Sequence, residues 1–149
     1  MNYKHTQISY PMIAITFIVG IFFISAYISA LREPPSYDSG PNFAITAIMI
    51  SIVSILSSFV SLTVSVDEKY LWVKFGYRIY QKKFLLSDIV STQIVTNKWY
   101  YGWGIRVWFL PKMWIYNISG FDAIEIQLKN KKIYQIGTYE AKKLAEILS

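Results

Sequence analysis

Two long runs without a charged residue constrain this chain more than any other feature. The first extends from Ile8 to Leu31 and the second from Ser39 to Val66, and they cover 24 and 28 of its 149 residues. An α-helix rises about 1.5 Å per residue, so about 20 apolar residues cross the hydrocarbon core of a bilayer. The first run therefore predicts a transmembrane helix over residues 8–31.

A cleaved signal peptide is the alternative interpretation of the first run. The apolar core of a secretory signal is roughly 7 to 15 residues long, which is shorter than this run. The end of the run contains Ser29 and Ala30 but no Ala-x-Ala cleavage site. Both features favour a helix that stays in the membrane.

The second run predicts a helix that is followed directly by a strand. Residues 32–42 contain three prolines and a glycine, which end both helices and predict a short extracytoplasmic loop. The run that follows is too long for one crossing, and its last residues alternate between apolar and polar side chains. We therefore expect a second transmembrane helix over residues 43–61 and a strand from Leu62 onward.

Small and hydroxyl-bearing side chains predict how the two helices pack. Four serines of the second run recur on one helical face, and Thr16 and Gly20 lie about one turn apart on the first helix. The four are Ser51, Ser54, Ser58 and Ser61. We expect the hydroxyl groups to bond to backbone carbonyls or to each other. Neither run contains Asp, Glu, Lys, Arg or His, which argues against a pore or a carrier.

The excess positive charge lies in the C-terminal half of the chain. Of fifteen Lys and Arg and nine Asp and Glu, residues 1–66 hold two of each sign, so residues 67–149 carry the whole net charge of +6. Membrane proteins keep excess Lys and Arg on the cytoplasmic side. We therefore expect a multi-pass protein of the cytoplasmic membrane, with the N-terminal tail (residues 1–7) and a C-terminal domain (residues 62–149) in the cytoplasm.

From Leu62 onward the pattern has a period of two, which is typical of antiparallel strands with one buried face. The strand-like segments are separated by turn residues. Seven are predicted, at residues 62–66, 70–75, 78–84, 89–96, 114–118, 123–128 and 133–136. A C-terminal helix follows, because Thr138 offers a capping hydroxyl and an apolar stripe has helical spacing. The stripe consists of Ala141, Leu144, Ala145 and Leu148.

This order of elements, and three motifs, resemble the small bacterial PH-domain (pleckstrin-homology-like) membrane proteins. The motifs are Tyr101-Gly102-Trp103-Gly104-Ile105-Arg106, the run from Trp114 to Ile126, and Ile136-Gly137-Thr138. The resemblance implies a two-helix transmembrane hairpin followed by a seven-stranded antiparallel β-barrel that the C-terminal helix caps. It also implies a scaffold for binding and assembly, rather than a catalyst, in a bacterial cytoplasmic membrane. Some relatives are associated with resistance to membrane-active bacteriocins.

The basic residues after the first hairpin allow two interpretations. Lipid-binding PH domains place a basic cluster in that hairpin, whereas this chain has Asp67-Glu68-Lys69 there, which argues against a specific phosphoinositide pocket. Lys82 and Lys83 follow on a more diffuse basic face. That face either contacts anionic lipid headgroups or is a solvated cytoplasmic surface.

Aromatic residues are concentrated between Lys98 and Trp114. This stretch holds four of the five tryptophans. In one interpretation it lies at the membrane interface. In the other its rings fill the mouth of the barrel and Arg106 pairs with Asp122 or Glu125. The residues predicted to form a membrane-interface or partner surface are Trp99, Tyr100, Tyr101, Trp103, Arg106, Trp108, Lys82 and Lys83.

Catalysis and nucleic-acid binding find little support in the sequence. There is no cysteine, the only histidine is His5 in the tail, and neither a nucleophile elbow nor a phosphate-binding loop is present. We therefore expect no catalytic residues, no cofactor and no metal. The chain also lacks the long basic track that nucleic-acid binding by base stacking would need.

These features predict a non-catalytic, membrane-anchored binding or assembly module. Its expected partners are the lipid bilayer and either another membrane protein or a second copy of the chain. The alternative hypothesis is a membrane-stress or bacteriocin-resistance factor of the immunity type, which would use the aromatic and basic surface at the lipid headgroups.

Overall fold

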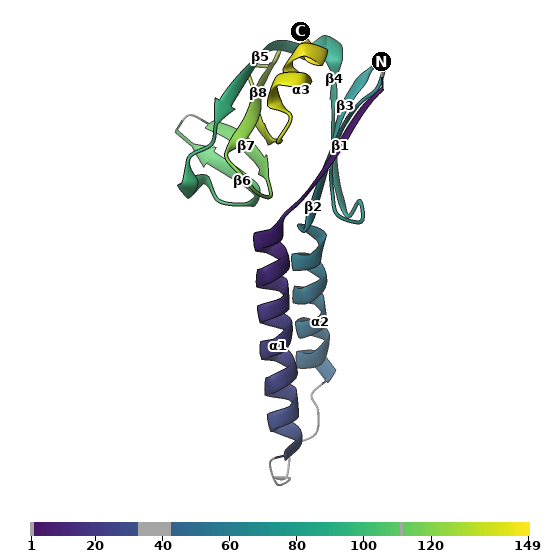
Figure 1. Ribbon diagram of the computed structural model, residues 1–149, viewed down its shortest axis with the longest axis vertical. Coiled ribbons are helices and arrows are strands. Elements are labelled where there is room, and N and C mark those ends of the chain that lie inside the picture. The colour runs from purple at the N-terminus through teal and green to yellow at the C-terminus, as the bar shows by residue number, and fades with distance from the viewer. Residues whose placement is uncertain (1, 33–42, 111) are drawn as a thin grey trace.

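The computed structural model describes residues 2–32, 43–110 and 112–149. Two long helices, α1 (Tyr10–Arg32) and α2 (Phe43–Ser58), extend from one end of a β-rich body, and the short helix α3 (Ala141–Leu148) lies at its other end (Figure 1). The strands are β1 (Tyr3–Ile8), β2 (Ser61–Val66), β3 (Tyr70–Phe75), β4 (Tyr80–Leu85), β5 (Ile89–Thr96), β6 (Gly104–Phe109), β7 (Lys112–Asn117), β8 (Asp122–Leu128) and β9 (Ile133–Gly137). Single 3-10 turns are η1 (Leu86–Asp88) and η2 (Trp99–Tyr101).

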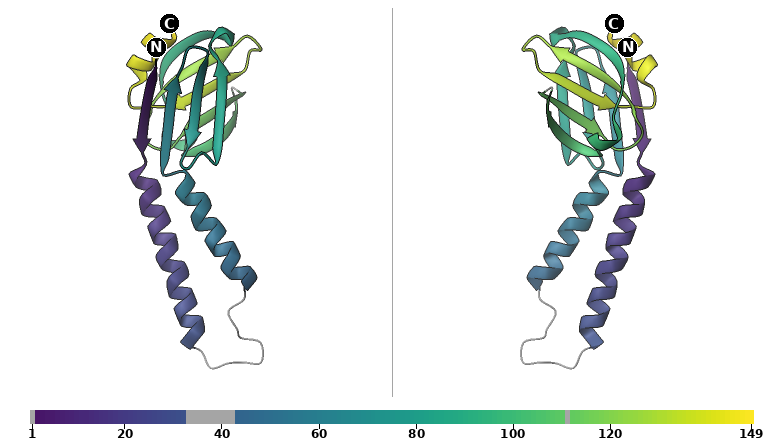
Figure 2. Two further views of the ribbon diagram at one scale, coloured as in Figure 1. Left: turned by 90° about the vertical axis from the view of Figure 1, so that its right-hand side faces the viewer. Right: turned by 90° about the vertical axis from the view of Figure 1, so that its left-hand side faces the viewer.

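The strands form two sheets rather than a barrel. One sheet has the order β1-β2-β3-β4 and the other the order β5-β8-β9-β7-β6. All neighbours are antiparallel except β7 and β9. The two sheets face each other as layers (Figure 2). The prediction of a closed seven-stranded antiparallel barrel is therefore wrong, because β4 and β5 are each the edge strand of a different sheet.

Two strands lie where no strand was predicted. The residues expected to be an N-terminal tail form β1, which pairs along its whole length with β2, from Tyr3 opposite Val66 to Ile8 opposite Ser61. Residues 104–109 of the aromatic stretch form β6, which pairs with β7. β1 is mostly polar, whereas β6 is mostly apolar and aromatic with one charged residue, so neither strand shows the clear alternation that predicts a strand from its own pattern.

The long helices follow the predicted apolar runs with shorter bounds. Within the described residues, α1 is the helix that is long and apolar enough to cross a membrane, and α2 is a shorter apolar helix of 16 residues. α2 ends at Ser58, three residues before the predicted end. The predicted loop at residues 32–42 lies outside the described residues apart from Arg32, which ends α1.

The hydroxyl groups on these helices bond to their own backbone. Thr16, Ser51 and Ser54 each donate to the carbonyl oxygen four residues earlier, at 2.7, 2.7 and 2.8 Å. This confirms the expectation that the hydroxyls are satisfied by backbone carbonyls.

The hydrophobic core lies between the two sheets and is closed at one end by α3. Strand residues from both sheets are fully buried, as the alternating pattern predicts. Leu144 of α3 is fully buried among them, and Ala141 is also buried, which confirms the predicted apolar stripe. Next to α3, Tyr3 donates its hydroxyl to Glu140 at 2.8 Å. Burial and this carboxylate raise the pKa of Tyr3 above its ordinary value.

Candidate membrane-facing surface

Ser9 joins the long helices to both sheets. Its hydroxyl accepts the backbone N–H of Met12 at 3.2 Å, which caps α1, and donates to the carbonyl of Ile118, just after β7, at 2.6 Å. Its backbone N–H donates to the carbonyl of Val60, between α2 and β2, at 2.7 Å. Ser9 is fully buried, so these bonds are shielded from water. The helix pair is thus fixed to the sandwich without a flexible linker.

The sequence contains a signal for this joint that the prediction overlooked. Ser9 precedes Tyr10 and Pro11, and a serine followed by a proline in the first turn is typical of a helix start. The predicted helix began at Ile8 because only the absence of charge was considered. Recognising Ser9 as the cap would have placed the start at Tyr10.

A groove of about 630 Å³ opens where the long helices meet the five-stranded sheet. Its helical wall comes from the first turns of α1 and the end of α2. Its other wall is formed by residues 102–107, which include Trp103 and Arg106. Two of the residues predicted for a membrane interface therefore lie beside the base of the helices.

Arg106 makes none of the ion pairs that one interpretation of the aromatic stretch required. Its Nε donates to the carbonyl of Trp103 at 3.2 Å, and within the described residues no carboxylate lies within 4 Å of its guanidinium. The carboxylate of Glu125 instead accepts bonds from Gln93 and Gln135, at 2.6 and 2.8 Å. The predicted pairing of Arg106 with Asp122 or Glu125 is therefore wrong, and the guanidinium of Arg106 stays exposed.

Four other aromatic residues of the stretch form a cluster on η2 and β6, in which neighbouring rings are tilted or edge-on. Trp108 contacts the rings of Tyr100 and Tyr101, with centroids 5.5 and 4.9 Å apart, and Trp99 packs edge-on against Tyr100. Tyr101 is buried with Met113, whereas the side chain of Trp99 is 80% exposed. The stretch therefore divides into rings that pack inward and rings that remain at the surface.

The two predicted lysines lie on β4, in the other sheet. Lys83 is exposed, and its Nζ lies 4.9 Å from the ring of Tyr70 and 5.5 Å from that of Trp72. Lys82 pairs with the buried Val73 but is exposed, because β4 is an edge strand. The structure thus separates the predicted surface into three parts, which are Trp103 and Arg106 beside the helices, the aromatic cluster on η2 and β6, and the lysines on the four-stranded sheet.

The turn between β3 and β4 was not among the predicted site residues, yet it lies beside α2. Gly76 packs so closely on the backbone of Ser58, the last residue of α2, that a Cβ atom would lie 2.3 Å from the Ser58 oxygen. The next residues project outward, and the side chains of Tyr77 and Ile79 are 79% and 69% exposed. An exposed Tyr and Ile in a turn were visible in the sequence, but their position beside α2 was not.

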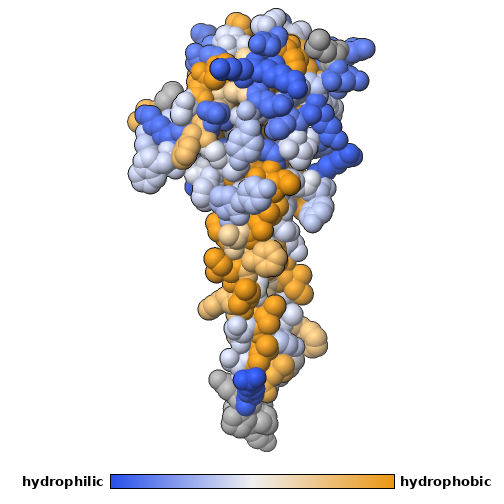
Figure 3. Space-filling view, in the orientation of Figure 1, coloured by the Kyte–Doolittle hydropathy of each residue, from blue (hydrophilic) through white to orange (hydrophobic). Residues whose placement is uncertain are grey.

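Exposed aromatic and basic side chains, with one isoleucine, therefore surround the junction of helices and sandwich. We call this set the collar, and it consists of Tyr10, Tyr77, Arg78, Ile79, Trp103 and Arg106. Hydrophobic side chains cover the helices and hydrophilic ones are abundant over the sandwich, so the surface changes character at this level (Figure 3). Aromatic rings with a polar group, and basic side chains, are the residue types that prefer the membrane–water interface.

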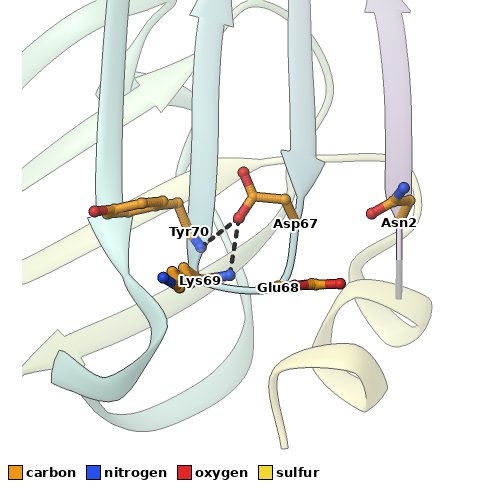
Figure 4. A pocket seen from close by; sticks show the side chains of 5 residues that line it. All are labelled: Asn2, Asp67, Glu68, Lys69 and Tyr70. Carbon is orange, nitrogen blue, oxygen red and sulfur yellow. Dashed lines mark hydrogen bonds between the residues drawn. The ribbon is translucent and has the colours of Figure 1, made fainter.

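A second pocket lies around Asp67, at the turn between β2 and β3. The Asp67 carboxylate accepts the backbone N–H groups of Lys69 and Tyr70, at 2.9 and 2.7 Å (Figure 4), and the indole N–H of Trp72 at 2.8 Å. These bonds lower the pKa of Asp67 below its ordinary value. The shallow pocket here is also lined by Glu68, so its charge does not suit an anionic headgroup.

Comparison with protein-family models, with curated proteins and with solved structures returned no match. The resemblance to bacterial PH-domain membrane proteins therefore remains a prediction from the sequence.

Proposed function

We propose that this protein is a non-catalytic, membrane-anchored binding module. In this proposal α1 and α2 cross the bilayer as a hairpin and hold the β-sandwich against its cytoplasmic face. The buried joint at Ser9 is the observation that carries the proposal, because it couples the helices to both sheets without a linker. Such a joint presents the sandwich at one height and one orientation above the membrane.

The dimensions of the helices support this arrangement. The 23 residues of α1 span about 35 Å, which exceeds the roughly 30 Å of hydrocarbon in a bilayer. The 16 residues of α2 span only about 24 Å. A mismatch of this size costs a fraction of a kcal/mol per Å and is met by local thinning or by interfacial side chains. The collar supplies such side chains at the sandwich end of both helices.

An exposed apolar surface at the edge of the five-stranded sheet suits a protein partner. Trp99, Phe109 and Leu110 are 77% to 87% exposed, and β6 is an edge strand. Soluble proteins rarely expose apolar side chains of this size beside an unpaired strand edge unless a partner covers them. We propose that this surface contacts another membrane protein or a second copy of the chain.

Purification of the full chain in a mild detergent tests the association. We expect a complex on size-exclusion chromatography that Trp99→Ala combined with Phe109→Ala disrupts. The matched control is Phe121→Ala, an exposed phenylalanine between β7 and β8, and it should leave the complex intact. A chain that remains monomeric at all concentrations and binds no membrane protein would contradict this proposal.

Extraction and labelling in cells test the anchor. The chain should stay with membranes in alkaline carbonate. Because it has no cysteine, single cysteines can be introduced without background. Arg32→Cys should react with an impermeant maleimide in intact cells, whereas Ser149→Cys should react only after lysis. Extraction by carbonate, or the reverse labelling pattern, would contradict the proposed topology.

The position of Trp103 and Arg106 favours a second candidate function, a membrane-stress or bacteriocin-resistance factor. In that role the collar would occupy the headgroup layer and hinder insertion of amphipathic peptides. Deletion of the gene should then increase sensitivity to membrane-active peptides. A chain with Trp99, Trp103 and Arg106 replaced by Ala should fail to restore tolerance while it still accumulates in the membrane. Full restoration would contradict this role.

A further inference from the structure

The groove beside Arg106 has an apolar wall on one side and a basic group on the other. Its helical wall is apolar and consists of Met12, Ile15, Leu56 and Phe59. At its other side lies one exposed guanidinium. Only the Nε of Arg106 has a hydrogen-bond partner in the described residues, so its terminal N–H groups remain available.

We propose that this groove binds one anionic phospholipid. The phosphate is held by the guanidinium of Arg106, and an acyl chain lies along α1. This inference rests on the proposed function, because the groove meets lipid only if the long helices are in the bilayer. The planar guanidinium is suited to a phosphate because it can donate two parallel hydrogen bonds.

The path for the acyl chain continues from the groove along one face of α1. Ile15, Ile18 and Phe22 are spaced by three and four residues, so they lie above one another on the helix. All three are exposed in the described structure, and Ile18 and Phe22 are about two-thirds exposed. A lipid tail can therefore pack from the groove toward the middle of the membrane without leaving an apolar surface.

Two further observations favour a lipid over other occupants. Trp103 lines the same groove, and tryptophan prefers the boundary between headgroups and acyl chains. Gly102 has a φ of 70° and lies under the Arg106 side chain, where a Cβ atom would be 3.1 Å from Nε. The glycine thus allows Arg106 to lie close against the backbone beside the groove, at the level of the collar.

Native mass spectrometry of the full chain tests the site. The protein is released from detergent micelles after incubation with equal amounts of dioleoylphosphatidylglycerol and dioleoylphosphatidylcholine. We expect the wild type to retain one phosphatidylglycerol in preference to phosphatidylcholine. Arg106→Gln should reduce this preference about fivefold or more, as expected for the loss of one well-placed base. Arg106→Lys should restore part of it. The matched control is Arg78→Gln, which removes another collar arginine outside the groove and should leave the preference unchanged.

A second pair of variants tests the apolar wall independently of the charge. Ile15→Trp fills the groove and should abolish lipid retention while Arg106 is intact. Ile24→Trp adds the same side chain to the opposite face of α1, at a residue that is 61% exposed, and should retain the lipid. Circular dichroism of each variant establishes that the fold is kept.

Three outcomes would overturn the lipid site. The first is equal retention of the two lipids by the wild type, and the second is an unchanged lipid preference in Arg106→Gln. The third is a dimer that Ile15→Trp alone abolishes, because such a dimer would assign the groove to a second copy of the chain. Carbonate extraction of the same variants distinguishes a failure of the lipid site from a failure of the proposed membrane anchor. A chain that stays in the membrane but shows no lipid preference refutes only the lipid site.

Discussion

Replacement of Gly76 by alanine should destabilise the contact that holds the β3–β4 turn on α2. Gly76 has a φ of 47°, in the left-handed region. Its N–H donates to the carbonyl of Ser61 at 2.9 Å, so the residue is fixed on both sides. A Cβ atom here would lie 2.3 Å from the Ser58 oxygen and 2.8 Å from the Ser58 carbonyl carbon. These are backbone atoms, which cannot rotate away as a flexible side chain would.

The expected loss follows from two contributions. A non-glycine residue in the left-handed region costs about 1–2 kcal/mol. Overpacking against a fixed structure costs about another 1–3 kcal/mol. Gly76→Ala should therefore lower the free energy of unfolding of the sandwich by about 2–5 kcal/mol, a large share of the roughly 5–15 kcal/mol that a domain has in total.

Urea titration in mild detergent, followed by tryptophan fluorescence, measures this loss. Gly76→Asn separates the two contributions, because asparagine tolerates the left-handed region but keeps the clash with Ser58. The matched control is Gly20→Ala in α1, where a Cβ atom would meet no heavy atom within 4 Å, so the midpoint should not fall. A Gly76→Ala midpoint equal to that of the wild type would refute the reasoning.

Three further perturbations test other parts of the structure. Ser9→Ala removes the cap of α1 and leaves the buried carbonyl of Ile118 without its donor, so urea unfolding should show a loss of about 1–3 kcal/mol; no change would mean that the joint is not structurally important. Leu144→Ala should cost about 2–5 kcal/mol in the same assay, because Leu144 is fully buried where α3 meets the core, and a smaller effect would indicate that α3 is not firmly packed. The pKa of Asp67 is lowered in the folded protein, so its ionised carboxylate contributes fully to stability above the ordinary carboxyl pKa of about 4. This contribution is lost as the pH falls toward the lowered pKa. Asp67→Asn should therefore flatten the acid side of the stability profile, and identical profiles for the two proteins would contradict the assignment.

The sequence predicted those helices and strands whose formation depends on residues close by in the chain. β3 and β5 have the predicted bounds, and the stripe on α3 packs against the core as expected. The two apolar runs contain α1 and α2. These predictions succeeded because side chains repeat with a period of two in a strand and 3.6 in a helix. Such repeats are visible without knowledge of what lies opposite.

Predictions that required a distant partner were less successful. β1 pairs with a strand more than 50 residues later in the chain, and its mixed side chains gave no strong local signal. One of the two interpretations of the aromatic stretch paired Arg106 with Asp122 or Glu125, but Glu125 bonds to Gln93 and Gln135. A sequence pattern shows that a residue can form an ion pair, but only the fold decides which groups come within reach.

The candidate surface shows the same division. The concentration of aromatic and basic side chains between Lys98 and Trp114 is visible in the sequence, but the sequence left open whether they lie near the helices or in the mouth of the β-domain. The tertiary structure decided three further features. Trp103 and Arg106 line a groove with the base of α1, Lys82 and Lys83 lie in another sheet, and the Gly76 turn packs on Ser58. Composition and period determine what each segment buries, whereas the pairing of segments far apart in the chain determines which of their exposed side chains become neighbours.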